Sequence, residues 1–371
     1  MNTEPSSLSS PALSAGLPDT FRVLPDLDEV WRATSAGERL DLVRRHAPRL
    51  RERVLESGQV ACVRTFDMSE LPYPTSFGLA GAASSPLPYL IMTNRAQLVQ
   101  FESSDGKRKI LLFNPTDVPR SAETPYFADL RKKMGDRLSR FVQERLRLPT
   151  AAEQITRAGV RPDEVDFIAF DHLHTQDLRG LLGTTGEGSS KGVFPRAQLL
   201  IWRPELSIFR ALHPLQRPWY IAEALSGVPS ERVLPVDGDL LLGQGVALVR
   251  TPGHTVGNWS LVVNTETGIW AVSENGIACD AYAPEMSAIP GVRRFAAQNG
   301  VEVILNSNTL EGRNEQYTSM VLEKCLVDRS PQNPSFYQHF ASSELTAKAF
   351  LPGLKPTYHH GKITSGALRP F

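Results

Sequence analysis

The sequence predicts a layered α/β protein, with β-sheets inside and helices outside. Strand-like segments cluster in two runs along the 371 residues, and helix-like segments follow each run. The segment VDFIAF (165–170) is a short, largely apolar strand of the kind that is buried on both faces of a sheet. We find no internal repeat and no clear linker, which favours one catalytic-type domain with extensions.

Each element follows from the spacing of apolar residues along the chain. Helices are expected at 27–57 (one or two), 124–146, 150–160, 287–300 and 314–330. Strands are expected at 59–68, 165–170, 197–202 and 301–308, as a hairpin around the turn SSDGK within 89–117, and as four or five consecutive strands within 231–276.

Composition narrows the classes of partner and compartment. Forty basic and forty acidic side chains cancel, so bulk charge predicts neither a nucleic-acid partner nor a membrane-surface partner. No stretch of about 18 apolar residues predicts a transmembrane helix, and the first 20 residues lack the pattern of a signal peptide. The cysteines are three in number and widely spaced (Cys62, Cys279 and Cys325), which excludes a disulfide framework and favours a reducing compartment. We therefore expect a cytoplasmic protein.

Two short motifs point to a metal site. The segment FDHLHTQDLRG (170–180) places His172 and His174 one residue apart, and in a strand such residues point the same way. The segment VRTPGHTVGNWSLVV (249–263) places His254 on a Pro-Gly turn between two strands. Three imidazoles around an open fourth position form the usual catalytic zinc geometry, so these histidines are the candidate ligands.

Four segments, in chain order, carry a resemblance to a known family: RAGVRPDEVDFIAFDHLHTQDLRG, TPGHTVGNWSLVV, GIWAVSENG and VEVILNSN. Between about residues 88 and 325 the chain resembles the metallo-β-lactamase fold hydrolases. The resemblance implies a four-layer αββα sandwich, in which two mixed sheets pack face to face and metals bind at one edge. We divide the chain into a disordered tail (1–25), a helical extension (26–86), a metallo-β-lactamase-like domain (87–330) and a C-terminal extension that packs on it (331–371).

The chain departs from the family pattern at the second metal site. The family motif H-x-H-x-D-H places its aspartate at Gln176 and its last histidine at Asp177. The bridging aspartate of the family falls on Glu274 or Asn275, depending on a one-residue shift of register, and its final histidine falls on Asn308. The resemblance therefore implies that the first site keeps its three histidines and that the second has lost its own.

We expect one metal ion, held by the three histidines with Glu274 and Asp177 as further ligands. Zinc is the first expectation, with iron or manganese as alternatives. The resemblance implies hydrolysis of an ester, lactone, thioester or amide in a small-molecule substrate by a metal-activated water, with Asp177 and Glu274 as the catalytic residues. Two alternatives stay open: an iron-dependent redox enzyme of the same fold, and a non-catalytic metal-binding pseudo-enzyme. A homodimer is also left open.

Several polar residues near these motifs have two interpretations. Asp177 can also cap a helix that starts at LRGLLG, and Asp117 is either a turn cap or a residue of the site. Arg179 is either a surface residue or a ligand for a substrate carboxylate, and we expect Asp171 to be structural. The C-terminal extension can remain a solvated tail or bring three further side chains to the metal: Tyr358, His359 and His360.

Overall fold

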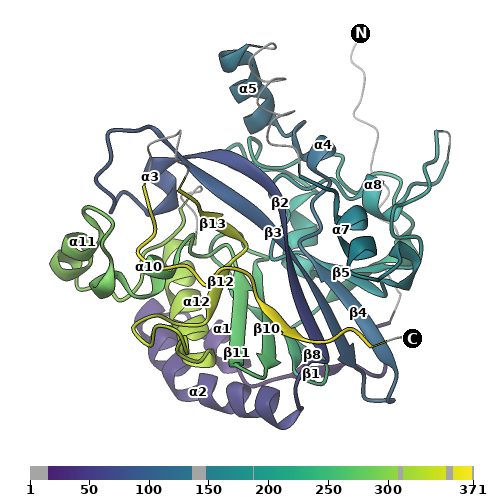
Figure 1. The fold of residues 1–371 in the computed structure, drawn as a ribbon, viewed down its shortest axis with the longest axis horizontal. Coiled ribbons are helices and arrows are strands. Elements are labelled where there is room, and N and C mark those ends of the chain that lie inside the picture. The colour runs from purple at the N-terminus through teal and green to yellow at the C-terminus, as the bar shows by residue number, and fades with distance from the viewer. Residues whose placement is uncertain (1–15, 136–147, 187, 308–311, 348–353, 370–371) are drawn as a thin grey trace.

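In the computed structural model, two β-sheets pack face to face and helices cover their outer faces (Figure 1). The structure describes residues 16–135, 148–186, 188–307, 312–347 and 354–369. Among these residues no helix is long and apolar enough to cross a membrane. The four-layer αββα architecture expected from the sequence is confirmed.

The smaller sheet has six strands in the order β1-β8-β9-β10-β11-β12. Its strands are β1 (Arg22–Leu24), β8 (Asp239–Gly243), β9 (Val246–Arg250), β10 (Trp259–Thr265), β11 (Gly268–Ser273) and β12 (His339–Ala341). Neighbouring strands are antiparallel from β1 to β11, and β12 then pairs in parallel with β11. β12, from the C-terminal part of the chain, is therefore an edge strand of this sheet.

The larger sheet has eight strands, ordered β14-β2-β3-β4-β5-β6-β7, with β13 also pairing with β3. Its strands are β2 (Cys62–Pro74), β3 (Tyr89–Glu102), β4 (Arg108–Phe113), β5 (Phe167–Ala169), β6 (Gln198–Trp202), β7 (Val233–Val236), β13 (Ser343–Leu345) and β14 (Thr364–Gly366). Strands β4 to β7 are parallel, and the other pairs are antiparallel. The sheet is thus mixed, and its parallel half includes the strand that leads to the HLH segment.

Alternation along the strands divides the apolar side chains among three layers. In β10, Leu261 and Val263 pack between the sheets, whereas Val262 packs against helices on the outer face. In β4, Leu111 lies between the sheets, whereas Leu112 lies on the opposite outer face. Both faces of each sheet are therefore covered.

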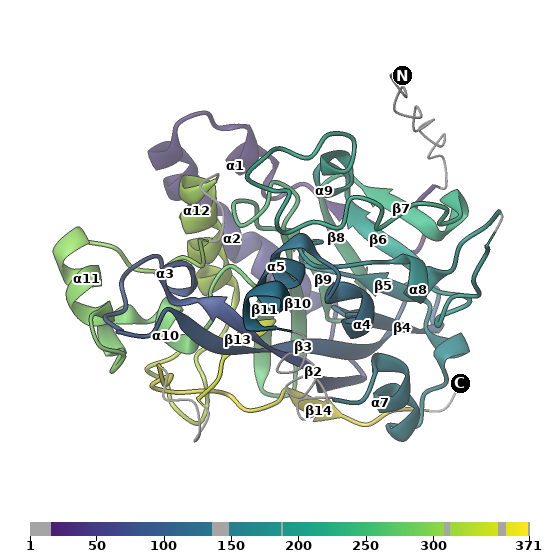
Figure 2. The same cartoon turned by 90° about the horizontal axis from the view of Figure 1, so that it is seen from above.

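The helices separate into two outer layers (Figure 2). On the six-stranded sheet lie α1 (Asp28–Arg32), α2 (Ala36–Glu56) and α12 (Arg313–Leu326). Residues of four others join the apolar cluster outside the eight-stranded sheet: α7 (Ala151–Arg157), α8 (Arg179–Leu182), α9 (Arg203–Ile208) and α11 (Val292–Asn299). The other α-helices among the described residues are α3 (Thr75–Gly78), α4 (Val118–Ser121), α5 (Pro125–Met134) and α10 (Cys279–Tyr282).

The boundaries drawn from the sequence do not coincide with breaks in the structure. Residues 22–24 of the expected tail form β1, while residues 1–15 lie outside the described part of the chain. β2, within the expected helical extension, pairs with β3 along its length. β12, β13 and β14, within the expected C-terminal extension, add strands to both sheets. Both extensions are therefore parts of the sandwich.

One expected strand is wrong. Residues 301–307 are buried in part but form no strand, and Asn308 lies outside the described residues. The reason is competition for one sheet edge, because β12 already pairs with β11 there. The segment makes only isolated backbone hydrogen bonds, such as the one that Asn306 donates to the carbonyl of Asn275 (3.0 Å).

Candidate metal centre and adjoining cleft

Three histidines meet beside the carboxyl end of β5. One ligand atom from each of His172, His174 and His254 lies within 4.8 Å of the other two, and all three residues are buried. The ring centroids of His172 lie 4.6 Å from His174 and 4.5 Å from His254. The Nε2 atom of His172 is buried with no hydrogen-bond partner among the described residues. Three converging imidazole nitrogens suit a cation such as zinc.

The HLH segment lies in a loop, not in a strand as the sequence reasoning assumed. β5 ends at Ala169, and Thr175 adopts a φ of 60°, which is uncommon for a residue other than glycine. The amide of Thr175 donates to the carbonyl of Trp219 (2.7 Å). The two histidines therefore converge because the loop turns, and not because a strand alternates its side chains.

The turn that carries His254 depends on two glycines. Gly253 has a φ of +129°, and a Cβ atom there would lie 2.1 Å from the backbone nitrogen of Gln316. A Cβ atom on Gly257 would lie 2.2 Å from the backbone nitrogen of Glu205. The turn therefore packs directly against the backbones of α12 and α9, which no larger residue at these positions allows.

Hydrogen bonds to Nδ1 orient two of the rings. The Nδ1 atom of His172 lies 2.9 Å from Oδ1 of Asp171, and that of His254 lies 3.2 Å from the carbonyl oxygen of Asn306. Asp171 also accepts from the backbone amide of His172 (2.9 Å) and from the hydroxyl of Ser342. Such bonds fix the tautomer and the direction of a metal-binding imidazole. Asp171 is thus structural, as expected, and its contact is with a candidate ligand.

Charge is unevenly distributed among the three rings. Burial opposes protonation of His172, but the charge of Asp171 and the hydrogen bond to it outweigh burial and raise the pKa of His172 to about 9. Burial and the nearby charge of His172 lower the pKa of His254 to about 3. Burial also lowers the pKa of His174 well below its ordinary value. Two rings are therefore held neutral, which is the form that binds metals.

The choice between Glu274 and Asn275 follows from their surroundings. Glu274 lines the cleft, and its Oε1 lies 3.9 Å from Nε2 of His254. Asn275 turns away and donates to Oε1 of the buried Glu323 (3.1 Å). Burial raises the pKa of Glu274 to about 7. Of the two residues, Glu274 is therefore the one beside the histidines.

Asp177 lies elsewhere than the sequence reasoning expected. Its Oδ2 accepts from Nη2 of Arg179 (2.6 Å), and its Oδ1 accepts from the backbone amide of the same arginine (3.0 Å). Asp177 is not in the histidine group and does not line the cleft. The reason is local, because Arg179, two residues later, donates hydrogen bonds to both carboxylate oxygens of Asp177. Asp117 caps α4 by accepting from the amide of Arg120 (3.5 Å).

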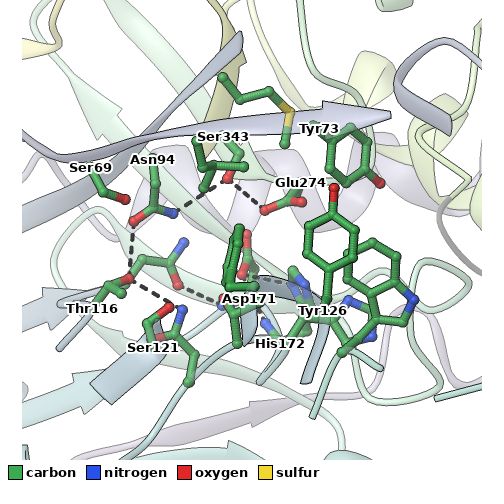
Figure 3. Close-up of a pocket in the computed structure, with 18 residues that line it drawn as sticks. Ser69, Tyr73, Asn94, Thr116, Ser121, Tyr126, Asp171, His172, Glu274 and Ser343 are labelled. Carbon is green, nitrogen blue, oxygen red and sulfur yellow. Dashed lines mark hydrogen bonds and ion pairs between the residues drawn. The ribbon is translucent and has the colours of Figure 1, made fainter. Parts of the chain in front are cut away.

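A chain of hydrogen bonds crosses the cleft wall (Figure 3). Gln176 donates to Thr116 (3.2 Å), which donates to Asn94 (3.0 Å). Asn94 donates to Ser343 (3.3 Å), which donates to Oε2 of Glu274 (2.7 Å). Gln176, at the family's aspartate position, thus donates a hydrogen bond to a hydroxyl group. The series of hydrogen bonds ends at the carboxyl group of Glu274, beside the histidines.

The cleft in front of the histidines has an empty volume of about 570 Å³, including the part open to solvent. Tyr73, Tyr126 and Trp219 line it together with three other apolar side chains, Leu71, Met92 and Phe127. The rings of Tyr126 and Trp219 stack with their centroids 4.5 Å apart, and Trp219 lies 6.0 Å from the ring of His174. One wall of the cleft can therefore hold an apolar group close to the histidines.

The C-terminal tail does not bring its histidines to this cleft. The hydroxyl of Tyr358 bonds to Ser330 (2.9 Å), His359 is exposed, and Nε2 of His360 lies 2.8 Å from the carbonyl of Tyr337. None of the three tail residues lines the cleft. Ser342 and Ser343, which precede these tail residues, contact the site instead. Ser342 donates a hydrogen bond to Asp171, and Ser343 donates one to Glu274. No sequence motif indicated either serine.

Sequence reasoning also missed Glu205. This residue is 1% exposed and contacts both histidine-bearing segments. Its signal was a lone glutamate at the start of a helix, directly after the apolar strand AQLLIW. An acidic residue at a helix start is common on protein surfaces, so the signal was weak.

No protein-family model matches the sequence. The N-acyl homoserine lactonase of Bacillus thuringiensis is 30% identical over 112 residues, which are 30% of this chain and 38% of that relative. A probable metal-dependent hydrolase from Staphylococcus aureus has a TM-score of 0.48 and 10% identity, over 70% of this chain and 82% of that chain. The dizinc quorum-quenching lactonase AidC, solved with a product, has a TM-score of 0.47 and 13% identity, over 80% of this chain and 94% of that chain.

The fold is decided by the layers of this molecule and by the place of its motifs. Two mixed sheets carry helices on both outer faces, and the HLH and PGHT segments meet at one edge. The chain forms the four-layer αββα sandwich that the resemblance to the metallo-β-lactamase fold hydrolases implies. Within this sandwich, His172, His174 and His254 form the group named by the motifs whose ligand atoms converge, and Asp177 lies outside that group.

Proposed function

We propose that this protein is a metal-dependent hydrolase that opens lactones. The observation that carries the proposal is the convergence of three buried imidazoles beside Glu274 in a partly apolar cleft. The lactonase relatives support the choice of a lactone among the esters and amides expected from the sequence. Because the chain spans 38% of the length of the first relative, its substrate is proposed and not transferred.

His172, His174 and His254 would hold the metal in this proposal, which leaves the fourth position of a tetrahedral zinc ion to water, and Glu274 is proposed as the base beside that position and not as a further ligand. Three nitrogen donors suit zinc, whereas manganese prefers oxygen donors. A zinc ion there supplies a Lewis acid for the ester carbonyl and lowers the pKa of a water molecule. Asp177 is no longer part of this donor set, because both of its oxygens face Arg179.

One ion is proposed, as expected from the sequence. Two of the family's second-site positions, 176 and 177, hold a neutral amide and an arginine-paired carboxylate. Neither offers the imidazole or free carboxylate that a second zinc ion prefers. A second ion should therefore bind more weakly than the first.

The chain's own groups provide the proton transfer and the substrate site. Glu274 stands beside His254, and its carboxyl group can accept a proton from the attacking water and return it to the leaving oxygen. Ser343 orients this carboxyl group by donating to Oε2 (2.7 Å). The aromatic wall around Trp219 binds the apolar part of a small-molecule substrate.

The two alternatives gain no support, since the curated relative described above is a lactonase. Neither the iron-dependent redox activity nor the pseudo-enzyme is favoured by a specific contact in the structure. The homodimer and the cytoplasmic location stay predictions from the sequence.

The test combines metal analysis with lactone hydrolysis. The purified protein should contain about one zinc ion per chain and should open N-acyl homoserine lactones, measured by proton release at constant pH. His254→Ala should lose most of the zinc and the activity, whereas Asp280→Asn, whose side chain does not line the cleft, should keep both. A protein that folds but binds no metal, or one that binds zinc and opens no lactone of any acyl chain length, would refute the proposal.

A further inference from the structure

Glu205, near the start of α9, is a buried carboxylate that the proposed reaction does not use. It is 1% exposed. Its Oε1 accepts from the backbone amide of Leu173 (2.7 Å) and from the hydroxyl of Tyr220 (2.8 Å). Its Oε2 accepts from the hydroxyl of Thr255 (2.7 Å). All three donors come from segments other than α9.

Each donor belongs to a segment that carries a candidate ligand or packs against one. Leu173 lies between the two histidines of the HLH segment, and Thr255 directly follows the histidine of the PGHT turn. The ring of Tyr220 packs edge-on against His174, with the centroids 4.7 Å apart. The carboxylate of Glu205 thus connects two loops that are far apart in sequence, since Leu173 and Thr255 are separated by about 80 residues.

The chemistry of a carboxylate explains why glutamate stands here. Burying a charged group is costly unless hydrogen bonds compensate for lost water, and three donors do so here. A carboxylate accepts through both oxygens, whereas a glutamine amide accepts through one only. Gly257 lets the turn approach, since a Cβ atom there would lie 2.2 Å from the backbone nitrogen of Glu205.

We propose that Glu205 is a positioning residue, which holds the HLH loop and the PGHT turn at the relative position where the three imidazoles converge. The inference rests on the metal site of the proposed function. Glu205 acts through the backbone and through Tyr220 and Thr255, and it does not touch the metal. Trp259 also links the two segments, since its backbone amide donates to the carbonyl of Asp171 (3.0 Å) and its indole N–H donates to the carbonyl of Phe170. Glu205 adds the link beside the histidines themselves, and without it each loop still folds on its own sheet but is held less closely there.

The experiment compares two buried carboxylates with the same kinds of donor. Asp280 is 0% exposed, accepts from Ser287 and from the amide and hydroxyl of Thr357, and does not line the cleft. Glu205→Gln and Asp280→Asn should lose similar stability, measured by urea unfolding of the metal-free proteins. Only Glu205→Gln should weaken zinc binding, by about tenfold, which is the lower end for groups that orient metal ligands.

Zinc affinity is measured by competition with a chromogenic chelator, under conditions where every variant is folded. The visible absorption of the Co²⁺-substituted protein should also change in Glu205→Gln and not in Asp280→Asn. If Glu205→Gln does not fold, Thr255→Val removes one donor only and should give a smaller, measurable loss of affinity.

Wild-type zinc affinity in Glu205→Gln, or in Thr255→Val where that variant replaces it, overturns the inference. Equal losses of affinity in Glu205→Gln and Asp280→Asn overturn it as well, because the effect would then follow general stability. Both results leave the proposed function standing. A wild-type protein that binds no zinc refutes the metal site itself, and the two failures are thereby distinguished.

Discussion

Replacing Asp171 tests how strongly the structure orients His172. The carboxylate accepts from Nδ1 of His172 and from its backbone amide, both at 2.9 Å, and from the hydroxyl of Ser342. Asp171→Asn keeps an oxygen that can accept both histidine bonds but removes the negative charge. Asp171→Ala removes the acceptor altogether and leaves a buried ring N–H without a partner.

The magnitudes follow from these contacts. A hydrogen bond to a charged group contributes about 1.5–3 kcal/mol, and about 1.4 kcal/mol corresponds to a tenfold change in affinity. Asp171→Asn loses only the charge, so we expect zinc to bind about tenfold more weakly. Asp171→Ala loses charge and bond together, so we expect a loss of about 100-fold, the upper end for partners of metal-binding histidines.

The assay is chelator competition at fixed pH, with urea unfolding of the metal-free variants to separate affinity from stability. Ser342→Ala is the matched control, because it touches only the other oxygen of Asp171, and it should change zinc affinity least. If both Asp171 variants bind zinc as tightly as the wild type, the hydrogen bond to Nδ1 does not orient the ring and the reasoning is refuted.

Three further predictions follow from the contacts described above. Asp177→Ala should lower the free energy of unfolding by about 1–3 kcal/mol, because it removes a hydrogen-bond partner of Arg179. Metal analysis should still find one zinc ion per chain. Loss of that ion would indicate that Asp177 belongs to the metal site. Gly253→Ala should lower the free energy of unfolding, measured in urea, by about 1–3 kcal/mol or more, because a Cβ atom would lie 2.1 Å from the backbone nitrogen of Gln316. It should also reduce the amount of bound zinc. A variant as stable as the wild type would contradict this close packing. Burial lowers the pKa of His360 from 6.5 to about 4, so the unfolded chain binds more protons between these values and stability should fall as the pH falls. His360→Asn should flatten that part of the urea-unfolding profile between pH 7.5 and pH 4, and an unchanged slope would refute it.

Local patterns in the sequence carried the fold and the histidines. The hairpin around SSDGK, the apolar strand before the HLH segment and the strands of 231–276 are each defined by a few neighbouring residues, and the structure contains them. His172, His174 and His254 were chosen by motif, and their ligand atoms lie within 4.8 Å of one another. Side-chain period and turn chemistry are local properties, so they are visible before the chain is folded.

What depends on distant residues could not be predicted in this way. Residues 301–307 form no strand, and in the folded protein β12, some 30 residues further on, occupies the place beside β11. Glu274 and not Asn275 stands beside the histidines because the side chain of Asn275 donates to Glu323, a residue of α12. Asp177 is the exception, since its partner Arg179 is only two residues away. The charge of Arg179, visible in the sequence beside the motif, decides the orientation of Asp177.

The late strands have a consequence for how the protein is made. β12 completes one sheet, and β14 pairs with β2, which lies about 300 residues earlier in the chain. Between them, Ser342 and Ser343 reach the carboxyl groups of Asp171 and Glu274. A nascent chain that has reached residue 330 therefore holds all three histidines, but the edges of β11, β3 and β2 that β12, β13 and β14 later cover are still unpaired. Until the next strands emerge from the ribosome, these edges are open to aggregation, and the ligand cluster lacks the hydroxyl groups that orient its acidic residues.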